Sequence, residues 1–495
     1  MAAASAAASC FRGSSRPNIL LILADDQSFG TPAQTPHFDR ITREGAVFTR
    51  AYTACPSCTP SRSAILTGRP IWQLAEAGVL YGQMPPELKR FPHLLEDSGY
   101  HTGYTGKGWV PGNWQAAGLK RNPCGREDNA ARLSPTPHSA LDPRDGAANF
   151  AAFLKDRPAG APFCFWFGST EPHRAYEKGA GLKQGKQLAD ARVPASLPGT
   201  PEVRSDLLDY YAEVEWFDQQ AGRVLAELEK TGELDNTLVI VTSDNGMPFP
   251  RAKANLYEAG VHMPLAIRWG ARGRPGMNLD EFVSHTDLAP TILEAAGLPI
   301  PPEVTGRSLV PLLEGKRDAT RDQVFFGMER HVIARPDGAT YPMRAIRAER
   351  WLFIRNFEPD RWPTGGDFLS SNRTTHGDVD AGPSIDVLLT RAKEFPLQHQ
   401  LCLGQRPPEE LYDVVADPDQ VKNLVDDPAH KNIVEKLRGR LNAYLRVTKD
   451  PRAEGRDPWQ QYTYHQTTGY GASFNNALPE DVRKAARERP THKPE

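Results

Sequence analysis

Three continuous apolar runs constrain the fold of this chain more than any other feature. They lie at residues 18–24, 163–167 and 237–242. A strand buried on both faces of a parallel sheet has such an uninterrupted run, whereas a half-exposed strand alternates between apolar and polar residues. A fourth run, at 265–269, fits the same description. The chain is therefore expected to build a large sheet with an apolar core on each face.

Segments with the helical spacing of apolar residues separate these runs. The clearest is 205–230, which reads as a long amphipathic helix that ends before Gly232. Shorter helices are expected at 36–45, 61–67 and 286–296. The alternation of strands and helices predicts the α/β class, with a mostly parallel sheet and helices on both of its faces.

Acidic and amide side chains directly follow two of the apolar runs. Asp25 and Asp26 come after the first run, and Asp244 and Asn245 come after the third. In sheets of this class, functional sites lie beyond the carboxyl ends of the strands. These hard oxygen ligands would suit Ca²⁺, and Mg²⁺ is the alternative that demands a stricter octahedron. The competing interpretation is that both pairs are ordinary turn and cap residues.

A segment with two cysteines follows the first run. It reads Cys55-Pro56-Ser57-Cys58-Thr59-Pro60-Ser61-Arg62 and continues as Ser63-Ala64-Ile65-Leu66-Thr67-Gly68-Arg69. Two cysteines at this spacing can form a redox pair or half of a zinc site. A zinc site needs a second ligand pair, but the remaining cysteines are isolated, at Cys10, Cys124, Cys164 and Cys402. The spacing alone leaves a redox pair open.

The pattern Cys58-x-Pro60-x-Arg62, with its Thr67-Gly68-Arg69 continuation, resembles the nucleophile segment of the type I sulfatases. The resemblance implies that a maturation enzyme oxidises Cys58 to formylglycine, whose oxygen joins the aspartates and Asn245 as a metal ligand. The hydrate of this aldehyde carries two hydroxyls. One attacks sulfur and expels the substrate alcohol or amine, and the other then loses its proton as the aldehyde re-forms and sulfate leaves.

The resemblance extends from Arg16 to about Leu445 and implies an alkaline-phosphatase-like fold. A catalytic domain is expected at 16–320. A smaller α+β domain with an antiparallel sheet is expected at 321–447, where short strands are predicted within 343–356 and near 410–413. Residues 1–15 would be a leader or the remnant of an export signal, and 448–495 a polar tail.

Four more residues acquire catalytic roles through the same resemblance. Arg62 would contact the formylglycine hydroxyl, while Lys107 and Lys253 would bind sulfate oxygens from two sides. His173 would hydrogen-bond to the leaving atom or protonate it. Taken singly, the lysines would equally fit solvated surface cations, and His173 would fit a loop cap.

Two positions depart from the family pattern. Trp109 stands where relatives have the histidine that takes the proton from the second formylglycine hydroxyl, and an indole cannot accept a proton. Asp25 or a water is expected to replace that base, unless Trp109 instead shapes the substrate pocket. His262 stands where many relatives have arginine, so the charge pattern around the sulfate is expected to differ.

Within the family, the chain resembles the sulfamidases most strongly. The segments that carry this resemblance include 242–250, 171–174 and 341–344. The implied substrate is N-sulfated glucosamine at the non-reducing end of heparan or heparin fragments. Residues proposed to recognise it are Glu329, Arg330, His331 and Arg344, although Arg344 would equally fit a salt bridge between domains. The alternatives are an exo-acting O-sulfatase on a glycosaminoglycan or algal polysaccharide, a phosphonate or phosphodiester hydrolase, and a non-catalytic glycan-binding relative.

Composition narrows the set of partners. The 59 Lys and Arg residues nearly balance the 61 Asp and Glu residues, for a net charge of -2, so a nucleic-acid partner is not expected. The sequence contains no apolar run long enough to span a bilayer. We expect a protein exported to the periplasm or the extracellular space, whose partners are a sulfated saccharide and the maturation enzyme, and a homodimer stays open.

Overall fold

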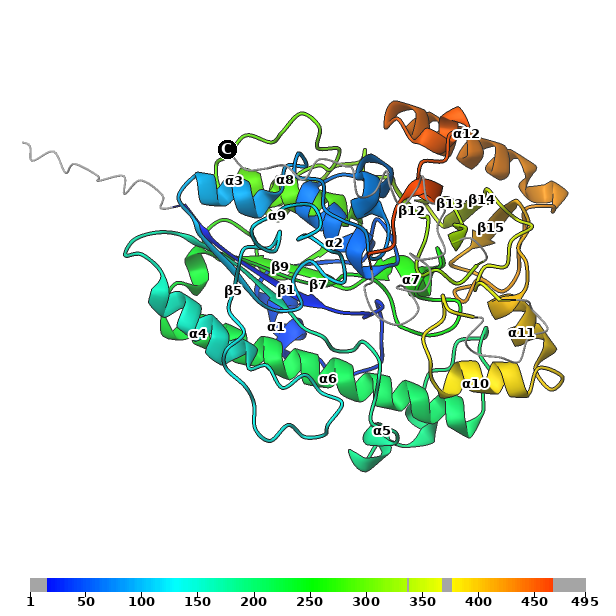
Figure 1. Ribbon diagram of the computed structural model, residues 1–495, viewed down its shortest axis with the longest axis horizontal. Helices are drawn as coiled ribbons and strands as arrows, with labels where there is room; N and C mark the ends of the chain where they lie inside the picture. The colour runs from blue at the N-terminus through cyan, green and yellow to red at the C-terminus, as the bar shows by residue number, and fades with distance from the viewer. Residues whose placement is uncertain (1–15, 336–337, 367–375, 466–495) are drawn as a thin grey trace, which may run out of the picture.

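The computed structural model describes residues 16–335, 338–366 and 376–465 (Figure 1). The predicted leader at 1–15 and residues 466–495 of the predicted tail lie outside the described residues. In the described part of the chain, no helix has both the length and the apolar character needed to cross a bilayer.

An eight-stranded mixed sheet forms the centre of the molecule, in the spatial order β10-β2-β9-β7-β1-β6-β4-β5. In chain order its strands are β1 (Asn18–Ala24), β2 (Ala46–Phe48), β4 (His101–Gly106), β5 (Arg126–Glu127), β6 (Phe163–Gly168), β7 (Thr237–Ser243), β9 (Leu265–Trp269) and β10 (Met277–Leu279). Strand β1 pairs in parallel with both β6 and β7, whereas β9 runs antiparallel to its neighbours β7 and β2. The predicted α/β class with a mostly parallel sheet is confirmed.

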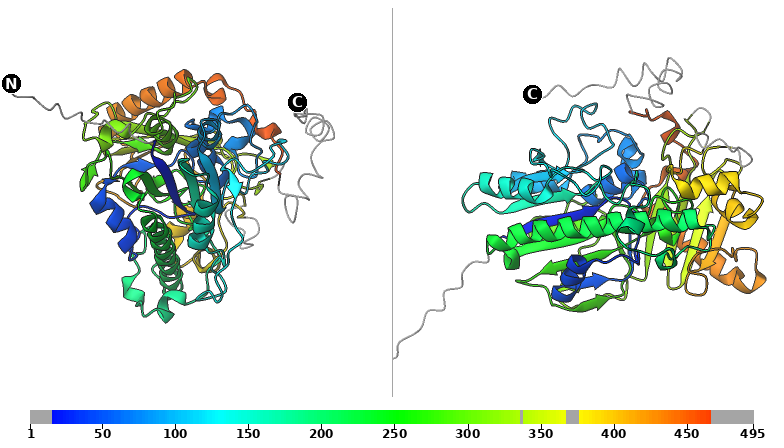
Figure 2. Two further views of the ribbon diagram at one scale, coloured as in Figure 1. Left: turned by 90° about the vertical axis from the view of Figure 1, so that its left-hand side faces the viewer. Right: turned by 90° about the horizontal axis from the view of Figure 1, so that it is seen from below.

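Helices cover both faces of this sheet, and the side chains of β1 show how (Figures 1 and 2). Ile19, Leu21 and Leu23 point into one core, and the residues between them, such as Leu20 and Ile22, point into the other. The first core is covered by α2 (Cys58–Thr67), α3 (Phe91–Asp97), α8 (Leu288–Ala295) and α9 (Val310–Leu313). The second is covered by α1 (Pro36–Glu44), α4 (Gly146–Asp156) and α6 (Pro201–Lys230). Burial on both faces explains the uninterrupted apolar run.

Two helices begin earlier than predicted. Helix α6 starts at Pro201 because Thr200 caps it, its side chain accepting a hydrogen bond from the Val203 backbone, and because proline suits the first helical position. Helix α2 starts at Cys58 itself, three residues before the predicted Ser61, with Ser57 as the extended residue in front of it. Cys58 therefore lies in the first turn of a buried helix.

A second, antiparallel sheet packs beside one end of the first (Figure 1). Its order is β12-β13-β14-β15, and its strands are β12 (Gln323–Met328), β13 (Met343–Ala348), β14 (Trp351–Asn356) and β15 (Glu409–Asp413). Helix α12 (Lys431–Val447) covers it through Val434, Leu437 and Leu441. The predicted antiparallel C-terminal sheet is confirmed. A third, small sheet has the order β11-β3-β8 and consists of β11 (Val283–Ser284), β3 (Ala51–Tyr52) and β8 (His262–Met263).

Four short helices complete the described part of the fold. They are α5 (Ala180–Lys183), α7 (Glu258–Val261), α10 (Pro383–Thr390) and α11 (Pro396–Leu403). Beyond α12, residues 448–465 run back past β12 and β13, where they contact Arg330 and Arg344. Trp459 is buried there in the C-terminal core, and the Trp72 indole donates a hydrogen bond to Thr448. Trp459 thus anchors a partly exposed stretch to the C-terminal core.

Candidate active site

The pairing of β1 with β7 brings the two polar strand ends together. Ala24 lies beside Ser243, so Asp25 and Asp26 follow one strand where Asp244 follows its neighbour. Carboxylate oxygens of these three aspartates lie within 4.8 Å of one another, and all three side chains are buried. Burial and the adjacent Asp25 raise the pKa of Asp244 to about 7. Burial of three neighbouring carboxylates thus opposes the ionisation of Asp244.

The donor set fits a hard cation. Asn245 uses its amide nitrogen to donate to Asp26 Oδ1 at 2.6 Å and to the Gly246 carbonyl at 3.0 Å. Its amide oxygen Oδ1 takes no part in these contacts. That oxygen is buried and accepts no hydrogen bond from any described residue. An orphaned amide oxygen beside three buried carboxylates is costly unless a cation binds them.

Cys58 lies next to this cluster. Its Sγ is 3.5 Å from Asp25 Oδ1 and 3.5 Å from Lys107 Nζ. Burial, reinforced by Asp25, raises the pKa of the Cys58 thiol well above its usual value. Burial also raises the pKa of Cys55, whose Sγ contacts Met328 Sδ at 3.4 Å. Two buried thiols with raised pKa values make a poor redox pair, because the thiolate is the reactive form.

Arg62 ties the helix of Cys58 to the strand ends. Its Nε donates to Asp244 Oδ2 at 2.8 Å, and its Nη1 donates to the carbonyls of Lys107 at 2.6 Å and Gly108 at 2.9 Å. The guanidinium is fully buried. In this structure its partners are the carboxylate cluster and the β4 loop, so it neutralises charge and positions Lys107.

Two lysines and a histidine surround the same point. Lys107 forms an ion pair with Asp25, and Lys253 Nζ donates to Asp26 Oδ2 at 2.7 Å. His173 places Nε2 3.9 Å from Asp26 Oδ2, while its Nδ1 lies against the Arg174 carbonyl. That backbone contact assigns the proton to Nδ1 and leaves Nε2 toward the cavity in the neutral ring. The structure thus brings together every residue predicted as catalytic or metal-binding.

A cavity of about 430 Å³ opens above Cys58. Asp25, Lys107, His173, Lys253 and His331 all line it. His331 was predicted as a substrate contact, and it does line this cavity. Its Nδ1 forms a hydrogen bond with Ser57 Oγ at 2.9 Å. The sequence patterns did not reveal four further polar lining residues, which lie in connecting segments: Tyr81, Arg144, Thr170 and Asp380.

The structure corrects three of the predicted substrate contacts. Arg344 is fully buried, and its guanidinium pairs with Glu329 Oε1 and with Asp450 Oδ2, both at 2.6 Å. Arg330 is buried too and donates to the Tyr462 carbonyl at 2.9 Å. None of the three lines the cavity above Cys58. They hold strand β12 to β13 and to the segment after α12, so Arg344 fits the salt-bridge alternative.

Trp109 also lies outside the cavity. Its ring is fully buried in the core beneath α2, and its indole N–H donates to Ser63 Oγ at 2.8 Å. Trp109 therefore supports the helix that carries Cys58, and the prediction that it contacts substrate is wrong. The large apolar ring packs in the core, and its N–H can only donate a hydrogen bond.

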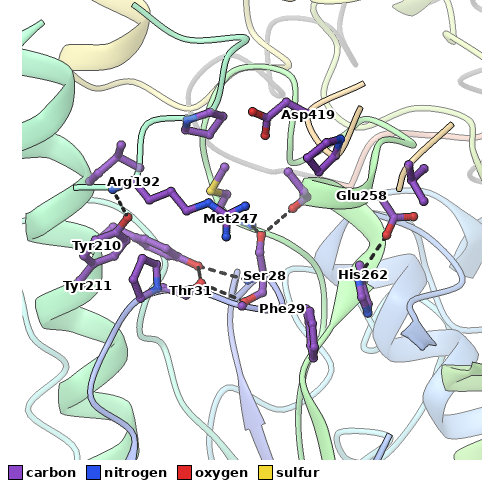
Figure 3. Close-up of a pocket in the computed structure, with 17 residues that line it drawn as sticks. Ser28, Phe29, Thr31, Arg192, Tyr210, Tyr211, Met247, Glu258, His262 and Asp419 are labelled. Carbon is purple, nitrogen blue, oxygen red and sulfur yellow. Dashed lines mark hydrogen bonds and ion pairs between the residues drawn. The ribbon is translucent and has the colours of Figure 1, made fainter. Parts of the chain in front are cut away.

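His262 borders a different cavity, of about 310 Å³, shown in Figure 3. Its ring stacks between Phe29 and Tyr52, at 4.2 and 4.8 Å between ring centroids, and its Nδ1 lies 3.2 Å from Glu258 Oε2. The prediction that it modulates the charge at the sulfate is wrong, because this histidine does not line the Cys58 cavity.

Comparison with protein families gives two matches. Residues 17–298 match the family model described as "Sulfatase", and residues 251–364 match the one described as "N-sulphoglucosamine sulphohydrolase, C-terminal". N-sulphoglucosamine sulphohydrolase of Homo sapiens is 32% identical, over 88% of this chain and 91% of the relative. An ulvan-active sulfatase of Formosa agariphila is 28% identical, over 88% of this chain and 81% of the relative.

Solved structures show the same architecture. One is a protein in complex with its substrate D-glucosamine-2-N,6-O-disulfate, with a TM-score of 0.64 and 21% identity, over 89% of this chain and all of the other. Another is a phosphonate monoester hydrolase from Silicibacter pomeroyi, with a TM-score of 0.64 and 20% identity, over 88% of this chain and 96% of the other. At this level of identity the likeness concerns the fold.

Proposed function

The chain belongs to the sulfatase family, and from that premise we propose that it removes the N-sulfate of glucosamine at the non-reducing end of heparan or heparin fragments. One observation carries the proposal. Cys58 lies at the floor of a cavity where cationic side chains converge beside a buried cluster of oxygen ligands. The match of residues 251–364 to a sulfamidase C-terminal model supports the N-sulfate over other sulfated groups.

Formylglycine made from Cys58 by a maturation enzyme would supply the hydroxyl that attacks sulfur. Lys107 and Lys253 both line the cavity and can each hold a sulfate oxygen, offsetting the charge that grows in the transition state. His173 presents Nε2 to the cavity, and only the doubly protonated imidazolium carries a proton there, which it can donate to the departing nitrogen. Since Trp109 is buried away from the cavity, Asp25 is the proton acceptor nearest to Cys58, with Oδ1 at 3.5 Å from Sγ.

A divalent cation would be held by Asp25, Asp26, Asp244, Asn245 and the oxygen that replaces Cys58 Sγ. We propose Ca²⁺ rather than Mg²⁺, because a cluster with this many anionic and amide oxygens suits six or seven ligands. When bound, the ion supplies positive charge to the transferring sulfuryl group. Arg62, already paired with Asp244, keeps that carboxylate oriented.

The test compares two substrates on protein whose Cys58 peptide shows the aldehyde by mass spectrometry. Sulfate release is measured with Ca²⁺ from N-sulfoglucosamine and from 6-O-sulfated N-acetylglucosamine. Release from the N-sulfated sugar is the expected result. Release from the O-sulfated sugar alone would refute the N-sulfate assignment and favour the second candidate, an exo-acting O-sulfatase, which the similarity to an ulvan-active sulfatase supports.

We also propose a catalytic domain at 16–320 and a smaller domain at 321–447, with export to the periplasm or the extracellular space. The separate antiparallel sheet supports the division, and the family's role in polysaccharide breakdown supports export. Cell fractionation tests the location, and activity with and without a co-expressed maturation enzyme tests that partner. Light scattering tests whether the protein forms a homodimer.

A further inference from the structure

Asp380 is a carboxylate that the reaction outlined above does not use. Among the described residues that line the cavity above Cys58, the carboxylates are Asp25 and Asp380. Asp25 belongs to the cation cluster, whereas Asp380 comes from the segment before α10, far along the chain. Its side chain is about a quarter exposed, at 26%. It is therefore open to a ligand in the cavity.

The acceptor capacity of Asp380 is only partly used. Its Oδ2 is buried and paired with Lys253 Nζ at 3.1 Å, so the exposed part of the side chain is what a ligand in the cavity can reach. Burial opposes ionisation, but Lys253, His173 and His331 hold the pKa of Asp380 below its usual range. An ionised carboxylate with spare lone pairs is a strong acceptor for an N–H or O–H group.

The position of Asp380 is on the leaving-group side of the site. An oxygen of Asp380 lies within 4.8 Å of a ring nitrogen of His173 and of an Asp26 oxygen. A ring nitrogen of His173 also lies within 4.8 Å of Cys58 Sγ. The atom that leaves sulfur must occupy the space that Cys58, His173 and Asp380 surround, because attack comes from Cys58 and His173 serves the departing atom.

We propose that Asp380 is a specificity-determining residue, whose carboxylate accepts a hydrogen bond from the N–H of the sulfamate group and so selects N-sulfates over O-sulfates. The inference rests on the proposed function and adds to it the residue that reads the bridging atom. It concerns binding of the leaving group and leaves the attack on sulfur unchanged.

The selection follows from the chemistry of the bridging atom. A sulfamate has nitrogen with one hydrogen between carbon and sulfur, so it can donate to Asp380. In a sulfate ester the bridging atom is an oxygen without hydrogen. Its lone pairs would be repelled by those of the Asp380 carboxylate. A site built to bind a donor disfavours an analogue that lacks it, because the buried acceptor is then left unpaired. As the amine departs it gains a second N–H, and the interaction strengthens.

The experiment uses two substrates that differ only in the bridging atom, N-sulfoglucosamine and glucose 2-sulfate. The ratio of their kcat/KM values is measured for the wild type, Asp380→Asn, Asp380→Ala and the control Asp97→Asn, an exposed carboxylate at the end of α3. Asp380 also holds Lys253, which would grip the sulfate of either substrate. A change in that grip affects both substrates alike and cancels in the ratio.

The expected result is a wild-type preference for N-sulfoglucosamine that falls about tenfold or more in both Asp380 variants, with the control unchanged. An unchanged ratio, including an equal loss on both substrates, would overturn the inference while leaving the proposed function intact. A wild type that cleaves only glucose 2-sulfate would overturn both. The wild-type measurement separates failure of the proposed function from failure of the inference, because it does not depend on the Asp380 variants.

Equilibrium binding and thermal melting together show whether an effect of the Asp380 substitution comes from lost recognition or from misfolding. Calorimetry with Cys58→Ala and Cys58→Ala/Asp380→Asn proteins measures the Kd of each sugar without turnover, and thermal melting reports whether each variant is folded. The inference requires that Asp380→Asn weaken N-sulfoglucosamine more than glucose 2-sulfate. Equal weakening would contradict it independently of catalysis.

Discussion

At the residue scale, the surroundings of Cys58 separate its role from that of Cys55. Both thiols are buried and have raised pKa values. Only Cys58 faces the cavity and contacts Lys107 and Asp25. Cys55 packs against Met328 on the other side of the segment. The pair therefore consists of one reactive position and one core residue.

Replacement of each cysteine tests that division. Cys58→Ala is expected to abolish sulfate release and to change the free energy of unfolding by less than about 1 kcal/mol, because the nucleophile is lost but little packing is. Cys55→Ala, the matched control, is expected to retain activity. Sulfate release and chemical denaturation measure the two effects. Equal activity loss in both variants would support a redox pair instead.

Glu213 in α6 is a second residue whose environment predicts a measurable property. Its side chain is buried and Oε1 has no hydrogen-bond partner among the described residues. Burial, with Glu171 and Asp209 nearby, raises the pKa of Glu213 to about 9. The folded protein thus keeps a proton that the unfolded chain releases above its ordinary pKa of 4.5. Stability from this group is complete below pH 4.5 and is lost as pH rises toward 9.

Glu213→Gln should remove that pH dependence, because the amide stays neutral. The variant is expected to be more stable than the wild type by about 5 kcal/mol at pH 8 and similar to it at pH 4. Urea denaturation at the two pH values measures the difference. A variant with the same stability gap at both pH values would contradict the raised pKa.

At the element scale, the parallel neighbours β4 and β6 position Lys107, because their backbones lie very close together where both strands end. The Lys107 amide donates to the Gly168 carbonyl at 2.6 Å. Gly106, with φ of +76°, lies so close that a Cβ there would be 2.0 Å from the Gly168 oxygen. Glycine at 106 is required both for its left-handed backbone and for the space it leaves.

Gly106→Ala is expected to lower kcat/KM for the sulfated substrate by about tenfold or more, because the displaced β4 end carries Lys107 away from Cys58. Gly160→Ala is the matched control, since Gly160 has φ of +75° but nothing within 4 Å of the added Cβ. Kinetics of both variants separate the steric effect from backbone strain. A similar loss of activity in Gly160→Ala would show that the close contact between Gly106 and Gly168 is not the cause.

The strand-end cluster predicts the effect of metal removal. Without a cation, buried carboxylates on β1 and β7 repel one another, as the raised pKa of Asp244 indicates. Chelation is expected to abolish turnover and lower the melting temperature, and Ca²⁺ should restore both better than Mg²⁺. Melting curves of the Cys58→Ala protein give the binding readout without turnover. A melting temperature that is insensitive to chelator and to Ca²⁺ would contradict the site.

At the scale of the whole molecule, the C-terminal part completes the cavity. His331 and Asp380 come from it, while Cys58 comes from α2 and Lys107 from the end of β4, both in the N-terminal part. Arg344 anchors this part through its buried ion pairs with Glu329 and Asp450. The network joins β12, β13 and the segment after α12, and its loss would release the wall that carries His331.

Arg344→Ala is expected to destabilise the protein by about 3–5 kcal/mol, because two buried carboxylates would lose their partner. Arg350→Ala is the control, since that arginine is about half exposed in its ion pair with Asp413, and its replacement is expected to cost little stability. Urea denaturation measures both. A mild effect at Arg344, with a change confined to KM, would restore it as a substrate contact.

The sequence by itself determined the sheet, the strand-end cluster and the position of Cys58. These follow from local properties: an apolar run reports burial on both faces, and the carboxyl ends of parallel neighbours meet at one edge. The Cys58 motif is continuous along the chain. The predicted catalytic and metal-binding residues converge in the structure because they sit on these elements or just after them.

Only the tertiary structure decided what the remaining side chains contact. Trp109 and Arg344 were expected near substrate, yet each finds its partner in another element, Ser63 for the first and Asp450 for the second. Asp380 reaches the cavity from a segment without a motif. The physical reason is that a buried polar group is assigned by the partner that satisfies it, and that partner can lie anywhere along the chain.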